Sequence, residues 1–292
     1  MAVMPQADSA RVERLGPHSV IEVTRFLDRD PVLNVFLQAV VLRDALAHPR
    51  DEFWGLRRGD ELTALVFLGV DSGLIAPVGD DAEALATLAQ WAGTRATRLP
   101  RRRHLVGARA TLGAFEPEFT RLLPPPRLAR DQLYLVVRSR SMGAHRLPEL
   151  RPAEPGDEAL LFESGVALRK EELDEDPLRV DALAYRRHVQ TECRQGTTFV
   201  WRRGDELCFR ATIGALSAVV AQISAVYTAP ALRNRGIGTR GVGELCHRLF
   251  ERVDHVSLFV NEFNAPALAV YRKLGFRLHA PWRSLFWGGP DG

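Results

Sequence analysis

A glycine-rich segment that carries two arginines is the part of this sequence best suited to binding an anion. It lies between a strand-like apolar run that ends near residue 228 and a helix-like run that starts near residue 239. Its residues are Arg233, Asn234, Arg235, Gly236, Ile237, Gly238 and Thr239. Glycine lets backbone N–H groups approach a phosphate without an obstructing Cβ, and a helix start offers unpaired donors and the positive end of its dipole. The pattern therefore predicts a pyrophosphate cradle, to which the two arginines add positive charge.

The same segment also matches the G-x-G-x-x-G pattern of dinucleotide-binding folds. Gly236, Gly238 and Gly241 have that spacing, and Glu262 follows roughly 20 residues later. In those folds, however, the first glycine follows its strand almost at once and opens a long domain. Here residues 229–232 intervene, and only about 50 residues follow the segment, which is short for a domain. This spacing favours a pyrophosphate cradle that does not belong to a dinucleotide-binding fold.

A second motif follows an apolar run at residues 256–260. It reads N-x-x-A-x-x-x-Y-x-x-x-G-F, from Asn264 through Tyr271 to Phe276. The cradle reads R-x-x-G-x-G from Arg233 to Gly238, and the two motifs occur in this order. Together they resemble the GNAT superfamily of acyl-CoA-dependent N-acetyltransferases, over roughly residues 148–287.

This resemblance implies an α/β fold with a mixed, mostly antiparallel central sheet flanked by helices. It implies that the cradle binds acetyl-CoA, the acyl donor, and that Asn264 contacts it as well. Tyr271 would be the general acid that protonates the departing CoA thiolate. Backbone N–H groups near the end of the fourth strand would hold the acetyl group and the pantetheine; these belong to Val226, Tyr227 and Thr228.

Plainer interpretations exist for the side chains in the second motif. Tyr271 shares helical spacing with Ala267, Val270 and Leu274, which is also typical of a core tyrosine. Asn264 precedes Ala265 and a proline, so helix capping alone would explain it. Gly241 and Gly243 weaken the helix that follows the cradle, and close approach to the ligand or to the sheet would explain why they are there.

The general base is not identified by the sequence. Many GNAT proteins have a glutamate eleven residues before the first cradle residue, and this chain has Gln222, which cannot accept a proton. Another carboxylate, His188 or a water chain would then serve. Glu262 follows the fifth strand, although a surface role is the commoner one for such a residue. An acidic run at residues 171–176 is either a solvated helix end or a rim that attracts a cationic acceptor.

The chain repeats a hexapeptide at half its length, which predicts two related domains. Arg-Arg-Gly-Asp-Glu-Leu occurs at residues 57–62 and again at 202–207, each time as a strand, tight turn and strand. We expect tandem GNAT-like domains at 1–145 and 146–292, with a linker at 139–147. The first half has Asp80, Asp81 and Glu83 where a cradle would lie, and carboxylates repel a pyrophosphate. It is therefore expected to be degenerate, with helices near 19–27, 30–46 and 81–91 and a strand at 132–137.

Composition excludes several other classes. The chain has 292 residues and a net charge of +3, so charge gives no reason to expect nucleic acid as a partner. Cys193, Cys208 and Cys246 lack the spacing of a zinc site or a disulfide framework, so no metal is expected. No apolar run is long enough to span a bilayer, which predicts a cytoplasmic protein without a membrane partner.

These observations predict an acetyl-CoA-dependent N-acetyltransferase that moves the acetyl group directly to a primary amine. Similar two-domain architectures favour a protein lysine as the acceptor. One alternative is a non-catalytic acyl-CoA sensor or interaction protein. Another is a small-amine or amino-sugar acetyltransferase, like the tandem GNAT proteins of thiol-cofactor biosynthesis. Oligomeric state and acyl-chain preference stay open.

Overall fold

The computed structural model describes residues 10–96, 99–139, 142 and 144–288, and the chain divides into two compact units. Unit 1 comprises Met1–Gln132 and Ala280–Gly288, and unit 2 comprises Leu133–His279 and Gly289–Gly292. These units differ from the ranges 1–145 and 146–292 in two places: residues 133–145 belong to unit 2, and the last strand belongs to unit 1. Part of the expected linker, residues 140, 141 and 143, lies outside the described residues.

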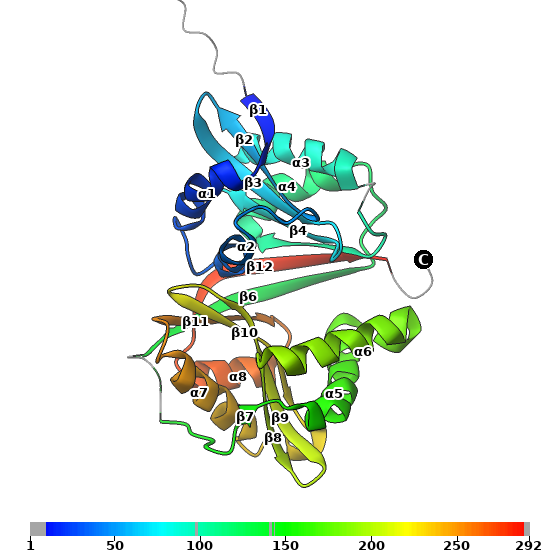
Figure 1. Cartoon of the computed structure of the whole chain (residues 1–292), viewed down its shortest axis with the longest axis vertical. Helices are drawn as coiled ribbons and strands as arrows, with labels where there is room; N and C mark the ends of the chain where they lie inside the picture. Colours follow the sequence, from blue (N-terminus) through cyan, green and yellow to red (C-terminus); the bar gives the residue numbers. More distant parts are fainter. Residues whose placement is uncertain (1–9, 97–98, 140–141, 143, 289–292) are drawn as a thin grey trace, which may run out of the picture. The chain divides into compact units, whose positions relative to one another are not determined.

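Unit 1 is an α/β unit in which two helices follow the first strand and one helix follows each of the fourth and fifth strands (Figure 1). Its elements are β1 (Ala10–Leu15), α1 (Val20–Leu27), α2 (Val35–Asp44), β2 (Asp51–Arg58), β3 (Glu61–Gly69), β4 (Leu74–Gly79), α3 (Ala82–Ala96), β5 (Arg103–Ala108) and α4 (Arg109–Thr120). Two strands divide between the units: β6 (Leu128–Arg138) and β12 (Arg277–Trp287).

Unit 2 repeats this order of elements. It contains β7 (Arg151–Pro152), α5 (Glu158–Leu173), α6 (Pro177–Gln195), β8 (Thr198–Arg203), β9 (Glu206–Leu216), β10 (Val220–Thr228), α7 (Ile237–Leu249), β11 (His255–Asn261) and α8 (Ala265–Lys273). Sequence sets the ends of α6, for example: the side chain of Asp176 accepts a hydrogen bond from the N–H of Leu178 at 3.0 Å, and Gly196 ends the helix with φ 64°.

The two units have the same strand pattern. In each, four antiparallel strands are followed by a parallel fifth: β1-β2-β3-β4 with β5 in unit 1, and β7-β8-β9-β10 with β11 in unit 2. A sixth strand completes each unit, namely residues 280–287 of β12 in unit 1 and residues 133–138 of β6 in unit 2. The chain thus has tandem α/β domains with mixed, mostly antiparallel sheets flanked by helices, as the sequence predicts.

The repeated hexapeptide forms the same hairpin twice, which confirms the predicted turns. Gly59 has φ 57° and Gly204 has φ 56°, a conformation that glycine adopts without a steric penalty. Arg58 pairs with Glu61 in the first hairpin, and Arg203 with Glu206 in the second.

Unit 2 buries apolar side chains on both faces of its sheet: Val200 and Trp201 alternate along β8, and a register shift in the pairing of β8 with β9 separates Leu207 from Phe209. Val200 of β8 and Leu207 of β9 pack with α5 and α6, whereas Trp201 and Phe209 pack with α7 and α8. Figure 1 shows α5 and α6 on one side of β8 to β10, with α7 on the other. We call these the α5/α6 face and the α7/α8 face.

Candidate functional site

Strands β10 and β11 run together only at their beginnings. Their parallel ladder extends from the pair Val220 and His255 to the pair Gln222 and Ser257. β10 continues to Thr228 and pairs there only with β9 among the described strands. An unpaired strand edge inside a domain needs another hydrogen-bond partner. The gap between β10 and β11 therefore offers backbone groups of β10 to a ligand.

A bulge changes the direction of β10 just before its end. Ala225 has φ 48°, and the register with β9 shifts between Ser224 and Tyr227. A bulge of this kind bends the strand and turns the following residues. It lies directly before Val226, Tyr227 and Thr228, the residues predicted to hold the acetyl group.

The bulge also reverses the alternation of side chains. The strand pattern predicts that Gln222, Ser224, Val226 and Thr228 share a face, and this prediction is wrong. Val226 instead packs in the α7/α8 cluster that contains Ile223, and Tyr227 packs on the α5/α6 face. One extra residue is enough to exchange the faces, because the period of a strand is two residues.

The cradle segment forms the start of α7. Gly236 is the N-cap residue with φ 74°, and no side chain caps the first turn. Asn234 also has a positive φ of 61°. A Cβ on Gly236 would meet no atom within 4 Å, so glycine is explained here by its positive φ rather than by a close neighbour. Ile237 and Thr239 are buried below this turn. An uncapped helix start suits an anion such as a pyrophosphate.

The cradle lies against the end of β10. A Cβ on Gly238 would lie 3.3 Å from Oγ1 of Thr228, and the Arg233 Nε donates a hydrogen bond to the Thr228 carbonyl at 3.2 Å. Arg233 is also paired with the carboxylate of Glu171 on α5, with N–O distances of 3.0 and 2.8 Å. Arg235 is exposed and has no ion-pair partner in the described part of the chain. One predicted arginine is thus free for an anion, and the other is held by α5.

Asn264 lies at the start of α8. Its Oδ1 accepts a hydrogen bond from the N–H of Ala267 at 3.1 Å. This bond gives Asn264 the capping role that the sequence allows. A contact with acetyl-CoA stays a prediction.

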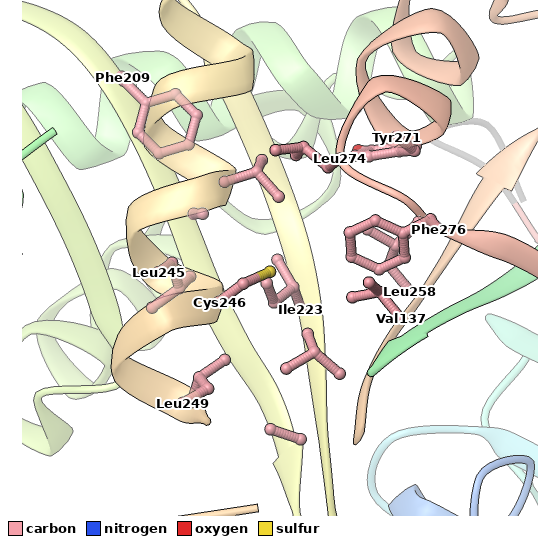
Figure 2. Close-up of a cluster of buried hydrophobic side chains, with 14 of the residues drawn as sticks. Val137, Phe209, Ile223, Leu245, Cys246, Leu249, Leu258, Tyr271, Leu274 and Phe276 are labelled. Atoms are coloured by element: carbon pink, nitrogen blue, oxygen red, sulfur yellow. The ribbon is translucent and has the colours of Figure 1, made fainter. Parts of the chain in front are cut away.

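Tyr271 is buried on the inner side of α8. Its ring lies 5.7 Å from that of Phe276, and Figure 2 shows both beside Leu274 in the α7/α8 cluster. Burial first, and the negative charge of Glu172 second, raise the pKa of Tyr271 well above its usual range. The phenol therefore keeps its proton at neutral pH, as a general acid must.

Glu172 is the residue that the sequence does not single out. It lies in the last turn of α5, its side chain is half-buried, and it acts electrostatically on Tyr271. Burial and the neighbouring charge of Glu171 raise the pKa of Glu172 to about 7. The acidic run at residues 171–176 was the available signal, but charge alone does not distinguish this carboxylate from its neighbours.

The acidic run is not a freely solvated rim. Glu171 is bound to Arg233, Glu175 is buried beside Arg169 at 3.6 Å, and Asp176 caps α6. Structural ion pairs account for these three carboxylates.

Gln222 is part of a buried polar chain. Its Nε2 donates a hydrogen bond to the hydroxyl of Tyr134 at 2.8 Å, and that hydroxyl lies 3.0 Å from Oγ of Ser257. All three residues are buried. The side chain that replaces the family's glutamate is therefore fixed by hydrogen bonds rather than poised for proton transfer.

The other candidates for the base lie on the surface. His188 is exposed on α6, 3.9 Å from Glu192 on the same helix, and Glu262 is exposed after β11.

Unit 1 has no comparable anion site at the equivalent point between β4 and α3. Asp81 accepts a hydrogen bond from the N–H of Ala84 at 2.9 Å and so caps α3. Arg58 pairs with both Asp81 and Glu83. The helix start that holds the cradle in unit 2 is filled here by the protein's own carboxylates.

Among the described residues, no helix combines the length and apolar character needed to cross a bilayer. The same part of the chain contains no group of three or more His, Cys, Asp or Glu side chains able to hold a metal ion.

Comparison with known proteins agrees with this geometry. The model of the acetyltransferase (GNAT) family matches residues 166–276. A search among curated proteins found no match.

Several solved structures share the fold over nearly the whole chain. One is a Drosophila protein with TM-score 0.70 and 14% identity, covering 97% of this chain and 100% of its own. A GCN5-related N-acetyltransferase from Sphaerobacter thermophilus has TM-score 0.63 and 17% identity, with 96% of each chain covered. A tandem GNAT protein from the clavulanic acid biosynthesis pathway has TM-score 0.55 and 15% identity, covering 96% of this chain and 99% of its own.

The family match covers α7, α8 and the strands β10 and β11 on either side of the gap. Residues 166–276 therefore match the acetyltransferase (GNAT) family model, within a two-unit fold similar to that of a tandem GNAT protein.

Proposed function

We propose that the protein is an acetyl-CoA-dependent N-acetyltransferase that moves the acetyl group directly to a primary amine. The observation that carries this proposal is the position of Tyr271, a protonated phenol near the gap that opens beside the uncapped start of α7. The amine can be a protein lysine, a small amine or an amino sugar.

Each part of the site would then have a defined task. The start of α7, with Arg235 and with Arg233 once it leaves Glu171, binds the pyrophosphate of acetyl-CoA. Backbone N–H groups between Val226 and Thr228 stabilise the oxyanion formed when the amine attacks, which is worth roughly 3 kcal/mol per donor in comparable sites. Tyr271 gives its proton to the sulfur that leaves.

Direct transfer is supported by the state of the cysteines. Cys193, Cys208 and Cys246 are all buried, and burial raises the pKa of each thiol. A thiol that holds its proton is a poor nucleophile, so an acetylated cysteine intermediate is disfavoured.

The first test measures CoA release from acetyl-CoA with a lysine peptide, a protein N-terminus, spermidine and glucosamine as acceptors. We expect one class of amine to support turnover. In Tyr271→Phe turnover should fall by roughly 10²–10⁴-fold while acetyl-CoA affinity stays unchanged. Tyr185→Phe, which alters a buried tyrosine on the α5/α6 face, is the matched control and should retain turnover. Full activity in Tyr271→Phe would remove Tyr271 from the chemistry.

A second candidate is an acyl-CoA sensor without turnover, which the hydrogen-bonded Gln222 at the usual base position favours. It predicts tight acetyl-CoA binding with no CoA release for any acceptor, and no effect of Tyr271→Phe.

A further inference from the structure

We infer that Glu172 is the general base, and that it takes a proton from the ammonium group of a cationic acceptor entering beside the end of α5. This inference rests on the proposed N-acetyltransferase function and names the residue that activates its acceptor. The substrate class it implies is an amine that arrives with its positive charge.

The position of Glu172 relative to the sheet is the main argument. α5 packs on the α5/α6 face, whereas Tyr271 belongs to the α7/α8 face. The negative charge of Glu172 nevertheless acts on the Tyr271 phenol. A continuous sheet would separate two such groups, but the ladder between β10 and β11 ends at Gln222. The acid and the base therefore approach the gap from opposite faces.

The end of α5 is anchored at this gap. Glu171 holds Arg233, whose Nε also binds the carbonyl of Thr228 at the end of β10. The next residue in the same helical turn is Glu172. Because neighbouring side chains on a helix point about 100° apart, one carboxylate can hold the cradle while the other faces elsewhere.

The groups around Glu172 suit a base that works near neutral pH. Its surroundings include Glu171 on its own helix and Tyr271 on α8, while Tyr227 on β10 and Arg233 lie near Glu171. Half-burial and the adjacent carboxylate hold the pKa of Glu172 at about 7. A carboxylate with this pKa is a stronger base than an ordinary one, and more than half of it is ionised above about pH 7.

The protons balance across the reaction. Glu172 removes the first proton from the ammonium nitrogen and later returns it to solvent. The free amine then forms the C–N bond, and the C–S bond breaks as Tyr271 protonates the sulfur. The second proton of the nitrogen leaves the tetrahedral intermediate and restores the phenol of Tyr271. The products are an amide, CoA thiol and one released proton.

The test compares Glu172→Gln with Glu163→Gln, an exposed glutamate on the same helix. The pH dependence of kcat/KM is measured with acetyl-CoA and, in turn, a lysine peptide, spermidine and glucosamine. The unmodified protein should lose activity as pH falls below about 7. Glu172→Gln should lose this acid limb, and its kcat should fall by roughly 10²-fold while acetyl-CoA affinity is unchanged. Glu163→Gln should behave as the unmodified protein.

A second measurement, which does not depend on catalysis, follows the titration of the glutamate side chains. In protein labelled with ¹³C at the glutamate side-chain carboxyls, one resonance should titrate near pH 7, vanish in Glu172→Gln and persist in Glu163→Gln. Glu172→Asp, which keeps the charge but shortens its reach, should retain the acid limb at a lower rate, so the inference can be judged even if Glu172→Gln does not fold.

The outcomes separate the two proposals. An active Glu172→Gln enzyme with an unchanged acid limb would overturn the inference and leave the acetyltransferase proposal standing. An unmodified protein that acetylates none of the three amines would overturn the acetyltransferase proposal, and the inference with it.

Discussion

At the scale of single residues, two glycines near the start of α7 have structural explanations. A Cβ on Gly241 would lie 2.6 Å from the ring of Phe209, and one on Gly243 would lie 2.6 Å from the backbone oxygen of His145. Gly241 therefore allows the helix to approach the sheet, and Gly243 allows the preceding segment of the chain to cross the helix. The sequence leaves two explanations for these glycines, close approach to a ligand or close approach to the sheet. Approach to the sheet explains Gly241, and the crossing segment at His145 explains Gly243.

Gly243→Ala should destabilise unit 2, because backbone is harder to displace than a flexible side chain. We expect a loss of about 1–3 kcal/mol in the free energy of unfolding. Gly113 in α4 is the matched control, since a Cβ there meets no atom within 4 Å, and Gly113→Ala should stabilise by up to about 1 kcal/mol. Urea denaturation measures both variants. Equal effects would contradict the steric explanation.

Glu244 on α7 accepts hydrogen bonds from Arg146 and Leu147, in the segment that crosses the helix. Its pKa gives the stability of unit 2 a pH dependence. Burial alone would raise its pKa, but hydrogen bonds from Arg146, Arg248 and the N–H of Leu147 outweigh this and lower it to about 2. Its contribution should therefore be complete above about pH 4.5 and be lost as pH falls towards 2. The contribution is at most about 3 kcal/mol.

Thermal unfolding between pH 7 and pH 2.5 checks this. The Tm of Glu244→Gln should be lower at pH 7 and should change less with acid than that of the unmodified protein. A parallel decline in both proteins would place the acid sensitivity elsewhere.

At the scale of elements, Glu171 on α5 competes with a bound anion for the guanidinium of Arg233. Both side chains are about half exposed, 55% and 42%, so the pair is weak and can open at little cost. Glu171→Gln should free Arg233 for the pyrophosphate and tighten acetyl-CoA binding by no more than about fivefold. Isothermal titration calorimetry measures this, with Glu163→Gln as the control. Weaker binding in Glu171→Gln would show that Glu171 supports the cradle instead.

The sequence predicts those elements whose ends depend on local chemistry. Both hexapeptide hairpins form because Gly59 and Gly204 take positive φ, and α8 starts after Asn264 as its capping pattern predicts. The helix expected at 30–46 begins only at Val35, because Asp30 accepts a hydrogen bond from the N–H of Leu33 and forms a turn.

Features that depend on distant parts of the chain were not predictable. The bulge at Ala225 has no glycine to mark it, and the Tyr134 that binds Gln222 lies 88 residues away. Glu172 differs from Glu171 only in what the fold places beside it. A sequence reports residue types, whereas burial and the approach of a second strand or helix decide what those residues do.

At the scale of the whole molecule, the last strand belongs to the first unit. Residues 282–287 pair with β5, and Leu285 and Trp287 are buried in the core of unit 1. Trp287 also donates a hydrogen bond to the carbonyl of Pro124 at 2.7 Å. A chain that ends at residue 279 should therefore lose the stability of unit 1, since a strand and two large core side chains are removed.

Limited proteolysis followed by mass spectrometry checks this. Cleavage within residues 10–132 should accelerate in the shortened chain, while unit 2 stays resistant and still binds acetyl-CoA. A chain that ends at residue 288 is the control. Faster cleavage in unit 2 alone would contradict the assignment of the last strand.

The placement of residues 280–288 also affects how the protein is made. These residues leave the ribosome after all of residues 133–279, although they belong to the unit whose synthesis began first. Domains usually fold in the order in which they are translated. Here unit 1 must wait until residues 280–288 have been synthesised to acquire its sixth strand, and until then the nascent chain exposes the edge of β5 to chaperones or to misplaced partners.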